Sequence, residues 1–358
     1  MLPNFFYTPE ILNYQFGPNH PFKPERLRRT IELLGRYGVE PIYPGDGKVE
    51  DLLRVHDERY VEAVRDLSDG KDVWNPYEFG FGSGDNPVFG GMYEAALSYC
   101  SATVRAAETV RDGEMLSFGI GGGLHHARRD LASGFCIFDD AAIACHILRE
   151  RFDRVAYVDI DVHHGDGVQG IFYDDPTVLT CSIHEEGRTL YPGTGWVEET
   201  GAEFSSFNVP VQGGTTGDVW LDTFEKTIPL AVEAFGAQAV VLQMGTDTHF
   251  LDPLAHVCST QHFWLEAIRE VSNWQLPLVA LGGGGYNLAT VPRMWVSACL
   301  TLGGIPYADE VPSDLAKQWG MPTYSDGEYG ETGVGSGHAA ITIDWLQREH
   351  IPNMRRSK

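Results

Sequence analysis

The chain has 358 residues, and its hydrophobic content of 43% is ordinary for a globular protein with a substantial core. Asp and Glu number 50 against 26 Lys and Arg, which gives a net charge of −24. This charge argues against a nucleic acid or an anionic membrane as the principal partner, because both require a basic surface. Solubility or an acidic proteome is the simplest reason for the excess of acid, and a cationic substrate is the other.

No segment of the sequence predicts export or membrane insertion. Residues 1–16 have neither the basic region nor the apolar core of a signal peptide. No apolar run approaches the ~20 residues that a membrane span requires. The six cysteines are scattered without a C-x-x-C pair, as is typical of reduced thiols. We therefore expect a cytoplasmic protein.

Helical and strand-like patterns alternate along the chain. In chain order they predict helices over 24–38 and 90–113, a strand over 115–120, a helix over 139–151, strands over 154–160 and 177–183, a helix over 217–236, and strands over 239–245 and 276–283. The strands are apolar on both faces, which indicates a mostly parallel sheet between two helical layers, an α/β fold.

The last part of the chain differs in composition. From about residue 305 the sequence is rich in glycine and acidic residues, with weak periodicity, and we expect only a short helix near 344–350. We interpret 303–358 as an extension that packs on a core of about 5–302, so that residues 1–358 form a single domain.

Each of the five predicted strands is followed by glycine-rich or polar residues. The segments are GGGLHHARR, DIDVHHGDG, HEEGRTLYPGTG, GTDTHFLDP and GGGGYN. Ligands of open parallel sheets bind outside the carboxyl ends of the strands. We therefore expect these five loops to meet at one functional site.

A metal centre is the first candidate at this site. Asp161 and His163 are two residues apart in an extended segment, so both side chains point the same way, and Asp247 follows a neighbouring strand. One imidazole and two carboxylates with a vacant position suit catalytic Zn²⁺ or Fe²⁺. A lone D-x-H would more often be a polar pair at a strand end, but Asp159, Asp166 and a second histidine pair favour the metal.

The second histidine pair, His125 and His126, follows three glycines at 121–123. Adjacent side chains in an extended loop point to opposite sides, so at least one imidazole should face the site. A catalytic imidazole needs a carboxylate on its far nitrogen, and Asp159 and Asp166 are available for this purpose.

Tyr286 follows four glycines. Its phenol could stabilise an oxyanion beside the metal, or the segment could be a tight turn whose tyrosine packs in the core, and the two interpretations are balanced. The glycine runs fit neither G-x-G-x-x-G nor G-x-x-x-x-G-K-[ST], which disfavours nucleotide binding.

Seven motifs together resemble the zinc-dependent histone deacetylase superfamily, which includes bacterial AcuC-type proteins and acetylpolyamine amidohydrolases. They occur in the family's order within about residues 5–302, and the resemblance implies the arginase/deacetylase fold. The motifs are HPFKPERLRR, GGGLHHA, SGFCIFDDAA, YVDIDVHHGDGVQGIFY, SIHEEGRTLYPGTG, QMGTDT and LGGGGY.

The resemblance also implies roles for individual residues. It makes Asp161, His163 and Asp247 the zinc ligands, and His126, oriented by Asp166, the general base and later the acid. It makes His125, which is paired with Asp159, the electrostatic partner histidine. It makes Tyr286 the residue whose phenol polarises the substrate carbonyl. A potassium site is implied at Asp159, Asp161, His163, Ser182 and Ile183, and a second one at Phe172, Asp175 and Val178.

Substrate contacts are implied in the same way. Gly134, Phe135 and Tyr191 would form the walls of an acyl-lysine tunnel. Asp85 would hold substrate backbone amides at its rim, and Arg26 would line an internal channel through which acetate leaves.

Two positions depart from the family pattern. Tyr191 stands where a second phenylalanine is usual, so that wall could donate a hydrogen bond. Leu254 stands where a polyamine-selective relative can carry an acid, and no role is evident for His249 and Phe250. The absence of that acid favours acyl-lysine as substrate.

The function implied is metal-dependent hydrolysis of N-ε-acetyl-lysine in proteins, releasing acetate and free lysine. An acetylpolyamine amidohydrolase of the same mechanism is the alternative, since the negative charge of the chain suits a polycation equally well. A binding module without catalysis is disfavoured, because every expected ligand and acid–base residue is present. The oligomeric state is left open.

Overall fold

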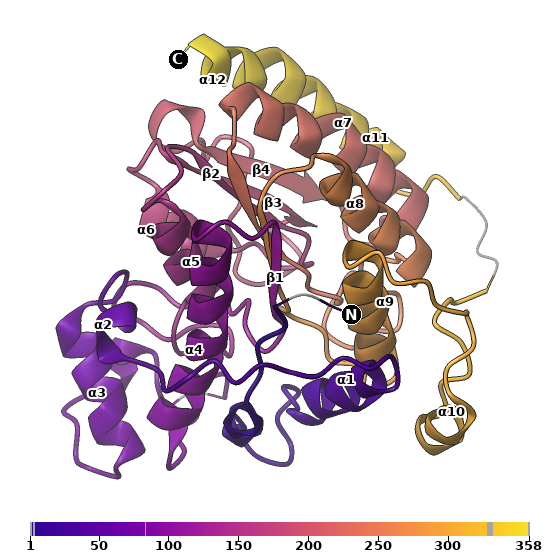
Figure 1. Cartoon of the computed structure of the whole chain (residues 1–358). Helices are drawn as coiled ribbons and strands as arrows, with labels where there is room; N and C mark the ends of the chain where they lie inside the picture. Colours follow the sequence, from indigo (N-terminus) through magenta and orange to yellow (C-terminus); the bar gives the residue numbers. More distant parts are fainter. Residues whose placement is uncertain (1, 3, 83, 328–331, 357–358) are drawn as a thin grey trace.

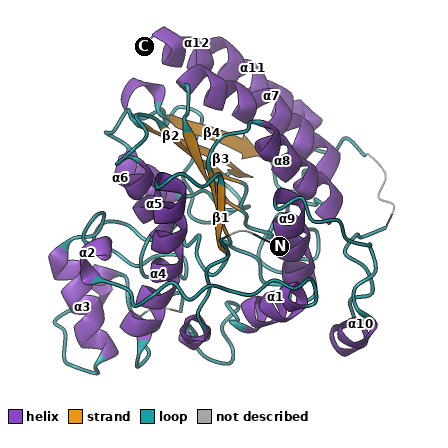
Figure 2. Ribbon diagram, in the orientation of Figure 1, coloured by secondary structure: helices purple, strands orange, loops and turns teal. Residues whose placement is uncertain are grey.

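The protein is described by a computed structural model that covers residues 2, 4–82, 84–327 and 332–356. Its centre is a parallel sheet with the strand order β1-β6-β5-β2-β3-β4 (Figures 1 and 2). The strands are β1 (Leu116–Gly119), β2 (Val155–Asp159), β3 (Val178–Glu185), β4 (Ser206–Val211), β5 (Ala239–Gln243) and β6 (Leu278–Leu281). The predicted parallel α/β sheet is confirmed.

Helices cover both faces of this sheet. Figure 1 shows α4, α5 and α6 on one side and α7, α8 and α9 on the other, which makes three layers. The helices are α1 (Glu25–Gly35), α2 (Val49–Leu52), α3 (Glu58–Ser68), α4 (Met92–Arg111), α5 (Asp140–Leu148), α6 (Asp166–Phe172), α7 (Gly217–Phe235), α8 (Gln261–Asn273), α9 (Thr290–Leu302), α10 (Ser313–Trp319), α11 (Ser336–Trp345) and α12 (Ile351–Arg356). Short 3₁₀ turns occupy Pro9–Asn13, Pro76–Phe79 and Ala202–Phe204, and a π-helical segment occupies Leu346–His350.

The two central strands, β2 and β5, determine where the site forms. Every residue of both strands is buried, as expected for Val- and Ala-rich segments covered on both faces. Their register pairs Asp159, the last residue of β2, with Gln243, the last residue of β5. The loops that follow the two strands therefore leave the same edge of the sheet side by side.

Local sequence signals explain several helix ends. The side chain of Asp139 accepts a hydrogen bond from the backbone N–H of Ala142 at 2.8 Å and so caps the start of α5. Helix α7 ends at Gly236, whose φ of +75° belongs to the left-handed region that glycine occupies without strain. Helix α1 buries Leu27, Leu33 and Leu34 and packs against α9.

Several parts of the fold were not predicted. Strand β4 was missed because Ser206, Asn208 and Pro210 interrupt its apolar pattern, and proline is tolerated there because β4 is an edge strand. Helices α2, α3, α6, α8, α9 and α10 were not assigned. The end of the chain is more helical than the short helix expected near 344–350, because α11 and α12 both pack along α7.

The opposite edge of the sheet is covered by the N-terminal segment. Phe5 pairs with Phe118 of β1, and the backbone N–H of Phe6 donates to the Phe118 carbonyl at 2.9 Å. Such pairing satisfies an exposed strand edge. Within the described ranges, none of the helices combines the length and the apolar character that crossing a membrane would need.

Candidate metal centre and active site

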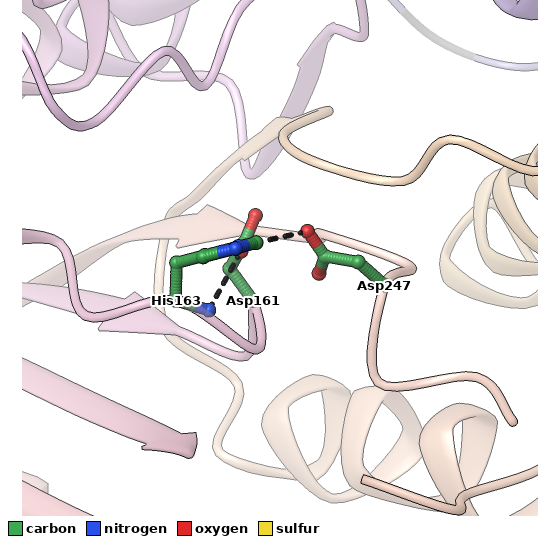
Figure 3. A group of neighbouring side chains, drawn as sticks. All are labelled: Asp161, His163 and Asp247. Atoms are coloured by element: carbon green, nitrogen blue, oxygen red, sulfur yellow. Dashed lines mark hydrogen bonds and ion pairs between the residues drawn. The ribbon is translucent and has the colours of Figure 1, made fainter. Parts of the chain in front are cut away.

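Asp161, His163 and Asp247 meet at the carboxyl ends of β2 and β5 (Figure 3). The Nδ1 atom of His163 lies 3.1 Å from Asp161 Oδ1 and 3.2 Å from Asp247 Oδ2. The three ligand atoms all lie within 4.8 Å of one another, and all three residues are buried. Because β2 and β5 are neighbours in the sheet, residues far apart in sequence form one compact group.

The orientation of the two carboxylates is fixed by nearby donors. Asp161 Oδ2 accepts hydrogen bonds from Gln243 Nε2 at 2.8 Å and from the backbone N–H of Gly284 at 2.7 Å. Asp247 Oδ1 accepts the backbone N–H of Val162 at 3.0 Å. The loop after β6 approaches so closely that a Cβ added at Gly284 would lie 2.1 Å from Asp247 Oδ2. Only glycine fits at this position.

The chemistry of this group fits a divalent metal ion. Burial disfavours the charged imidazole, but the Asp161 and Asp247 carboxylates overcome this and raise the pKa of His163 to about 10. Burial and the Asp161 charge raise the pKa of Asp247 to about 6. Two buried carboxylates around one imidazole call for a positive partner, and carboxylate oxygens with an imidazole nitrogen suit Zn²⁺ or Fe²⁺. The structure therefore contains a buried Asp–His–Asp group that could bind a metal.

The histidine pair lies beside this group. His125 Nδ1 is 2.7 Å from Asp159 Oδ2, and His126 Nδ1 is 2.7 Å from Asp166 Oδ1. The two Nε2 atoms are 3.1 Å apart. The expectation that neighbouring imidazoles point to opposite sides was wrong, because residues 125 and 126 form a turn that directs both rings to one place.

The two imidazoles have different proton affinities. Burial opposes charge on His125, but the carboxylates of Asp159 and Asp161 dominate and raise its pKa to about 9. Burial and the neighbouring His125 lower the pKa of His126 to about 4. His126 is therefore the neutral member of the pair, which suits a proton acceptor.

Both carboxylates behind the histidines have further partners. Asp159 Oδ2 accepts the Tyr157 hydroxyl at 2.7 Å. Asp166 Oδ2 accepts Arg128 Nη2 at 3.0 Å. Burial would raise the pKa of Asp166, but its contacts with His126 and Arg128 lower it to about 2. His126 is thus oriented by an ionised carboxylate that is itself held in place, while His125 is oriented by Asp159, whose pKa is raised by burial.

A narrow cavity lies beside His125 and His126, and one of its lining residues, Gly284, is hydrogen-bonded to Asp161. It is lined by Phe22, Gly123, Leu124, His125, His126, Gly134, Phe135, Cys136, Gly283, Gly284 and Tyr286. The Phe135 and Tyr286 rings meet edge to face with centroids 5.7 Å apart. Among the described residues, Tyr286 is hydrogen-bonded only through its backbone N–H, to Asp252, so its hydroxyl is available to a ligand. This placement favours the oxyanion interpretation of Tyr286 over a purely structural one.

Phe135 is held in an unusual conformation. It has a φ of +68° in a tight turn, where Ser133 and Cys136 exchange backbone hydrogen bonds of 3.0 and 2.8 Å. The Tyr14 hydroxyl donates to the Phe135 carbonyl at 2.8 Å and accepts the Ile137 N–H at 3.1 Å. Tyr14 thus fixes the turn that presents the Phe135 ring to the cavity.

Tyr191 is exposed and lies beside His126, the candidate general base. Its ring meets the His126 ring edge to face at 5.1 Å, and its hydroxyl is hydrogen-bonded to Ser133. Burial raises the pKa of the Tyr191 phenol, and the Asp166 and Asp85 carboxylates add to the rise. Asp85 itself is exposed.

Leu254 is half-buried, on the loop that follows Asp247. Its backbone N–H donates to Asp252 Oδ1 at 3.0 Å, while Asp252 Oδ2 accepts the Tyr286 N–H at 2.8 Å. Asp252 therefore couples the position of Leu254 to that of Tyr286. The role of Leu254 stays a prediction.

Arg26 lies beneath the glycine loop that carries Tyr286. It is buried and donates to the carbonyls of Gly283 and Gly285 at 2.8 and 2.9 Å. A second small cavity lies beside it, lined by residues that include Tyr14, Tyr99 and Trp295. An internal channel at Arg26 is consistent with this arrangement and stays a prediction.

The residues expected to bind potassium are also close together. Ser182 of β3 pairs in register with Asp159 of β2, and both are buried with Ile183. The second group lies at the start of β3, where the Asp175 N–H donates to the Phe172 carbonyl at 2.9 Å. Whether potassium binds at either place stays a prediction.

Sequence reasoning missed several residues that position the site. Tyr14, Tyr157, Gln243 and Asp252 were not singled out. Gln243 carried a signal, since a polar residue at the end of an apolar strand points to the loop side of the sheet. Tyr14 carried none, because its partner Phe135 is 121 residues away.

Comparison with known proteins agrees with this geometry. Residues 20–302 match the family model of the histone deacetylase domain. The acetoin utilization protein AcuC of Bacillus subtilis (strain 168) is 37% identical over 335 residues, which cover 88% of this chain and 86% of that protein. Histone deacetylase clr6 of Schizosaccharomyces pombe is 34% identical over 331 residues, 90% of this chain and 82% of that protein.

Solved structures are similar as well. The crystal structure of an HDAC homolog from Aquifex aeolicus has a TM-score of 0.87 and 26% sequence identity, and the match covers 95% of this chain and 98% of that one. The crystal structure of an HDAC homolog complexed with SAHA gives a TM-score of 0.88 at 26% identity, with the same coverage.

Proposed function

The chain belongs to the histone deacetylase family, and from this premise we propose that it hydrolyses the ε-acetyl amide of acetyl-lysine in proteins, releasing acetate and free lysine. One observation carries the proposal. His126 and Tyr286 line one narrow cavity, and Gly284, which lines it too, donates its backbone N–H to Asp161 of the buried Asp161–His163–Asp247 group.

We propose that Asp161, His163 and Asp247 hold Zn²⁺. When bound there, zinc would polarise the acetyl carbonyl and increase the acidity of a water molecule. Fe²⁺ suits the same three donors and is the alternative. The potassium sites at Asp159, Asp161, His163, Ser182 and Ile183, and at Phe172, Asp175 and Val178, are proposed from the family resemblance. The cytoplasmic location and the single-domain organisation stay predictions.

The protein's own residues perform the proton transfers. His126 accepts a proton from the attacking water through Nε2, and Asp166 stabilises the resulting charge on Nδ1. Tyr286 donates a hydrogen bond to the oxyanion that forms on the acetyl carbon. His126 then returns its proton to the lysine nitrogen as the amide bond breaks. His125, held by Asp159, stays charged and balances the carboxylates of the site.

The substrate is positioned by the walls of the cavity. The four methylenes of the acetyl-lysine side chain pass between Phe135 and Tyr191, next to Gly134. Asp85 at the rim accepts the substrate's backbone N–H groups. Acetate leaves through the interior past Arg26, whose charge attracts it.

Acetylpolyamines are the less favoured substrates. Leu254 provides no acid for a distant ammonium group, and the curated relatives reported above are named as AcuC and a histone deacetylase. The zinc-loaded protein should therefore have a higher kcat/KM for an acetyl-lysine peptide than for acetylputrescine or acetylspermidine. The reverse order would assign the chain to the polyamine enzymes. Tight peptide binding with no acetate release would indicate a binding module.

A further inference from the structure

His20 begins the HPFKPERLRR motif but has no place in the mechanism above. Its side chain is 8% exposed and lies between the rim and the wall of the cavity. The ring meets Phe135 edge to face, with centroids 4.5 Å apart, and contacts Phe16 at 4.6 Å. One imidazole therefore touches the turn that forms a wall of the cavity.

The hydrogen bonds of His20 define its tautomer. Nδ1 is 3.1 Å from the backbone N–H of Phe22, which can only donate, so Nδ1 is the acceptor. In the neutral ring the proton then lies on Nε2, which is 3.1 Å from the backbone carbonyl of Asp85. Burial lowers the pKa of His20, which favours this neutral form. Both nitrogens are thus used, and Nε2–H donates to Asp85.

This bond joins the rest of the chain to the rim loop, which we define by its described residues 82 and 84–88. Among the described residues, the His20–Asp85 bond is the only hydrogen bond or ion pair that joins this loop to the rest of the chain. The loop's other hydrogen bond is internal, from the Gly82 N–H to the Asn86 carbonyl at 3.2 Å. Asp85 is exposed, and among the described residues it is hydrogen-bonded only through its backbone carbonyl, so its carboxylate remains free for a ligand.

From these contacts we propose that His20 is a positioning residue for peptide recognition: through its bond to the Asp85 carbonyl it holds the Asp85 carboxylate where it can accept the substrate's backbone N–H groups. The inference rests on the proposed function and adds a residue that sets the preference for polypeptide over small amides. Without this bond the rim loop must be ordered by the substrate itself, which weakens binding. The chemistry at the metal end is unaffected, because His20 contacts none of the residues that act there.

Three substitutions separate the hydrogen bond of His20 to Asp85 from its hydrogen bond to Phe22. In His20→Asn the amide oxygen occupies about the place of Nδ1 and still accepts the Phe22 N–H, but the side chain is too short to reach Asp85. In His20→Gln the amide N–H reaches about as far as Nε2 and restores the donor. His20→Phe keeps the ring against Phe135 and removes both nitrogens.

Steady-state kinetics with two substrates provides the test. For an acetyl-lysine peptide, His20→Asn and His20→Phe should raise KM about tenfold, the scale of one lost hydrogen bond, with kcat nearly unchanged. N-hexylacetamide has the stem and acetyl group but no backbone amides, so His20→Phe, which keeps a ring against Phe135, should leave its kcat/KM unchanged. His20→Gln should restore the peptide KM. The double variant of His20→Asn with Asp85→Ala should be no worse than Asp85→Ala alone, since both remove one contact.

Other results would overturn the inference. Equal losses of kcat/KM on both substrates, with a lowered melting temperature, would make His20 a purely structural residue. If the effects of His20→Asn and Asp85→Ala added up in the double variant, His20 would not act through Asp85. Direct binding keeps this test independent of the proposed reaction: in a Tyr286→Phe background, His20→Asn should weaken peptide binding about tenfold. If the unaltered protein bound peptide in this His20-dependent way but released no acetate, the proposed function alone would fail.

Discussion

Gly134 lies directly against the imidazole of His126. A Cβ added at Gly134 would come within 2.3 Å of His126 Cδ2 and 2.7 Å of Cγ, and the backbone φ of +51° also disfavours any other residue. The imidazole cannot move away without weakening its 2.7 Å bond to Asp166.

We therefore expect Gly134→Ala to lower kcat on the order of 10²-fold, the scale of a misplaced catalytic group. Gly170→Ala is the matched control, because a Cβ there meets nothing within 4 Å and alanine favours the helix. Acetate release measured for both variants checks this. Full activity in Gly134→Ala would show that the turn moves freely.

Tyr286→Phe should lower kcat roughly 10²–10³-fold, the usual scale for one oxyanion donor. The melting temperature should stay nearly constant, since the hydroxyl forms no hydrogen bond with any described residue and the backbone bond to Asp252 is kept. Steady-state kinetics and thermal denaturation of the purified variant test both statements. Unchanged activity would remove Tyr286 from the mechanism.

Asp247→Asn should abolish zinc binding and acetate release, because an amide is a poor replacement for a carboxylate ligand. Zinc should raise the melting temperature of the unaltered protein after chelation, since an ion that binds only the folded state stabilises it. The same addition should leave Asp247→Asn unchanged. Metal analysis of the purified proteins provides a second readout, and a variant that retained one zinc per chain would contradict the ligand assignment.

Asp326 links the C-terminal extension, residues 303–358, to His249 on the loop that follows Asp247. This contact should make the free energy of unfolding depend on pH. Asp326 Oδ2 accepts His249 Nε2 at 3.0 Å, and its other oxygen is paired with Arg293. Burial opposes the charge, but these two partners lower the pKa of Asp326 from its usual 3.8 to about 2. This contact also gives His249 a structural role that its sequence did not reveal.

Because the folded pKa is below the unfolded one, the contribution of Asp326 is fully present above about pH 4 and is lost as the pH falls through about 2. Asp326→Asn should therefore be less stable than the unaltered protein at pH 6, and the difference should shrink in acid. Chemical denaturation of both proteins between pH 2 and 6 measures it. A difference that did not depend on pH would assign the effect to shape and not to charge.

Much of the sheet could be predicted because its central strands are buried on both faces. The runs that became β2 and β5 are apolar up to their last residues, Asp159 and Gln243, so their pattern alone identifies them. Strand β4 could not be recognised in this way, since an edge strand tolerates Pro210 and polar residues that a central strand excludes.

The metal ligands could be predicted for the same reason. Strand ends in a parallel sheet share one edge, so Asp161, His163 and Asp247 could be placed together without knowing the strand order. The supporting contacts could not. Tyr14 meets Phe135, and His20 meets Asp85, only because the N-terminal segment folds back against the core. The predicted directions of the His125 and His126 side chains were wrong, because these residues form a turn and the prediction assumed an extended backbone.

His163 and Asp247 follow neighbouring strands but are separated by 84 residues of sequence. During synthesis, the first two ligands leave the ribosome long before the third, and they cannot form the complete donor set until β5 has inserted beside β2. A metal ion held by these three residues would therefore meet its full set of donors only once β5 has joined the sheet, late in the folding of the chain.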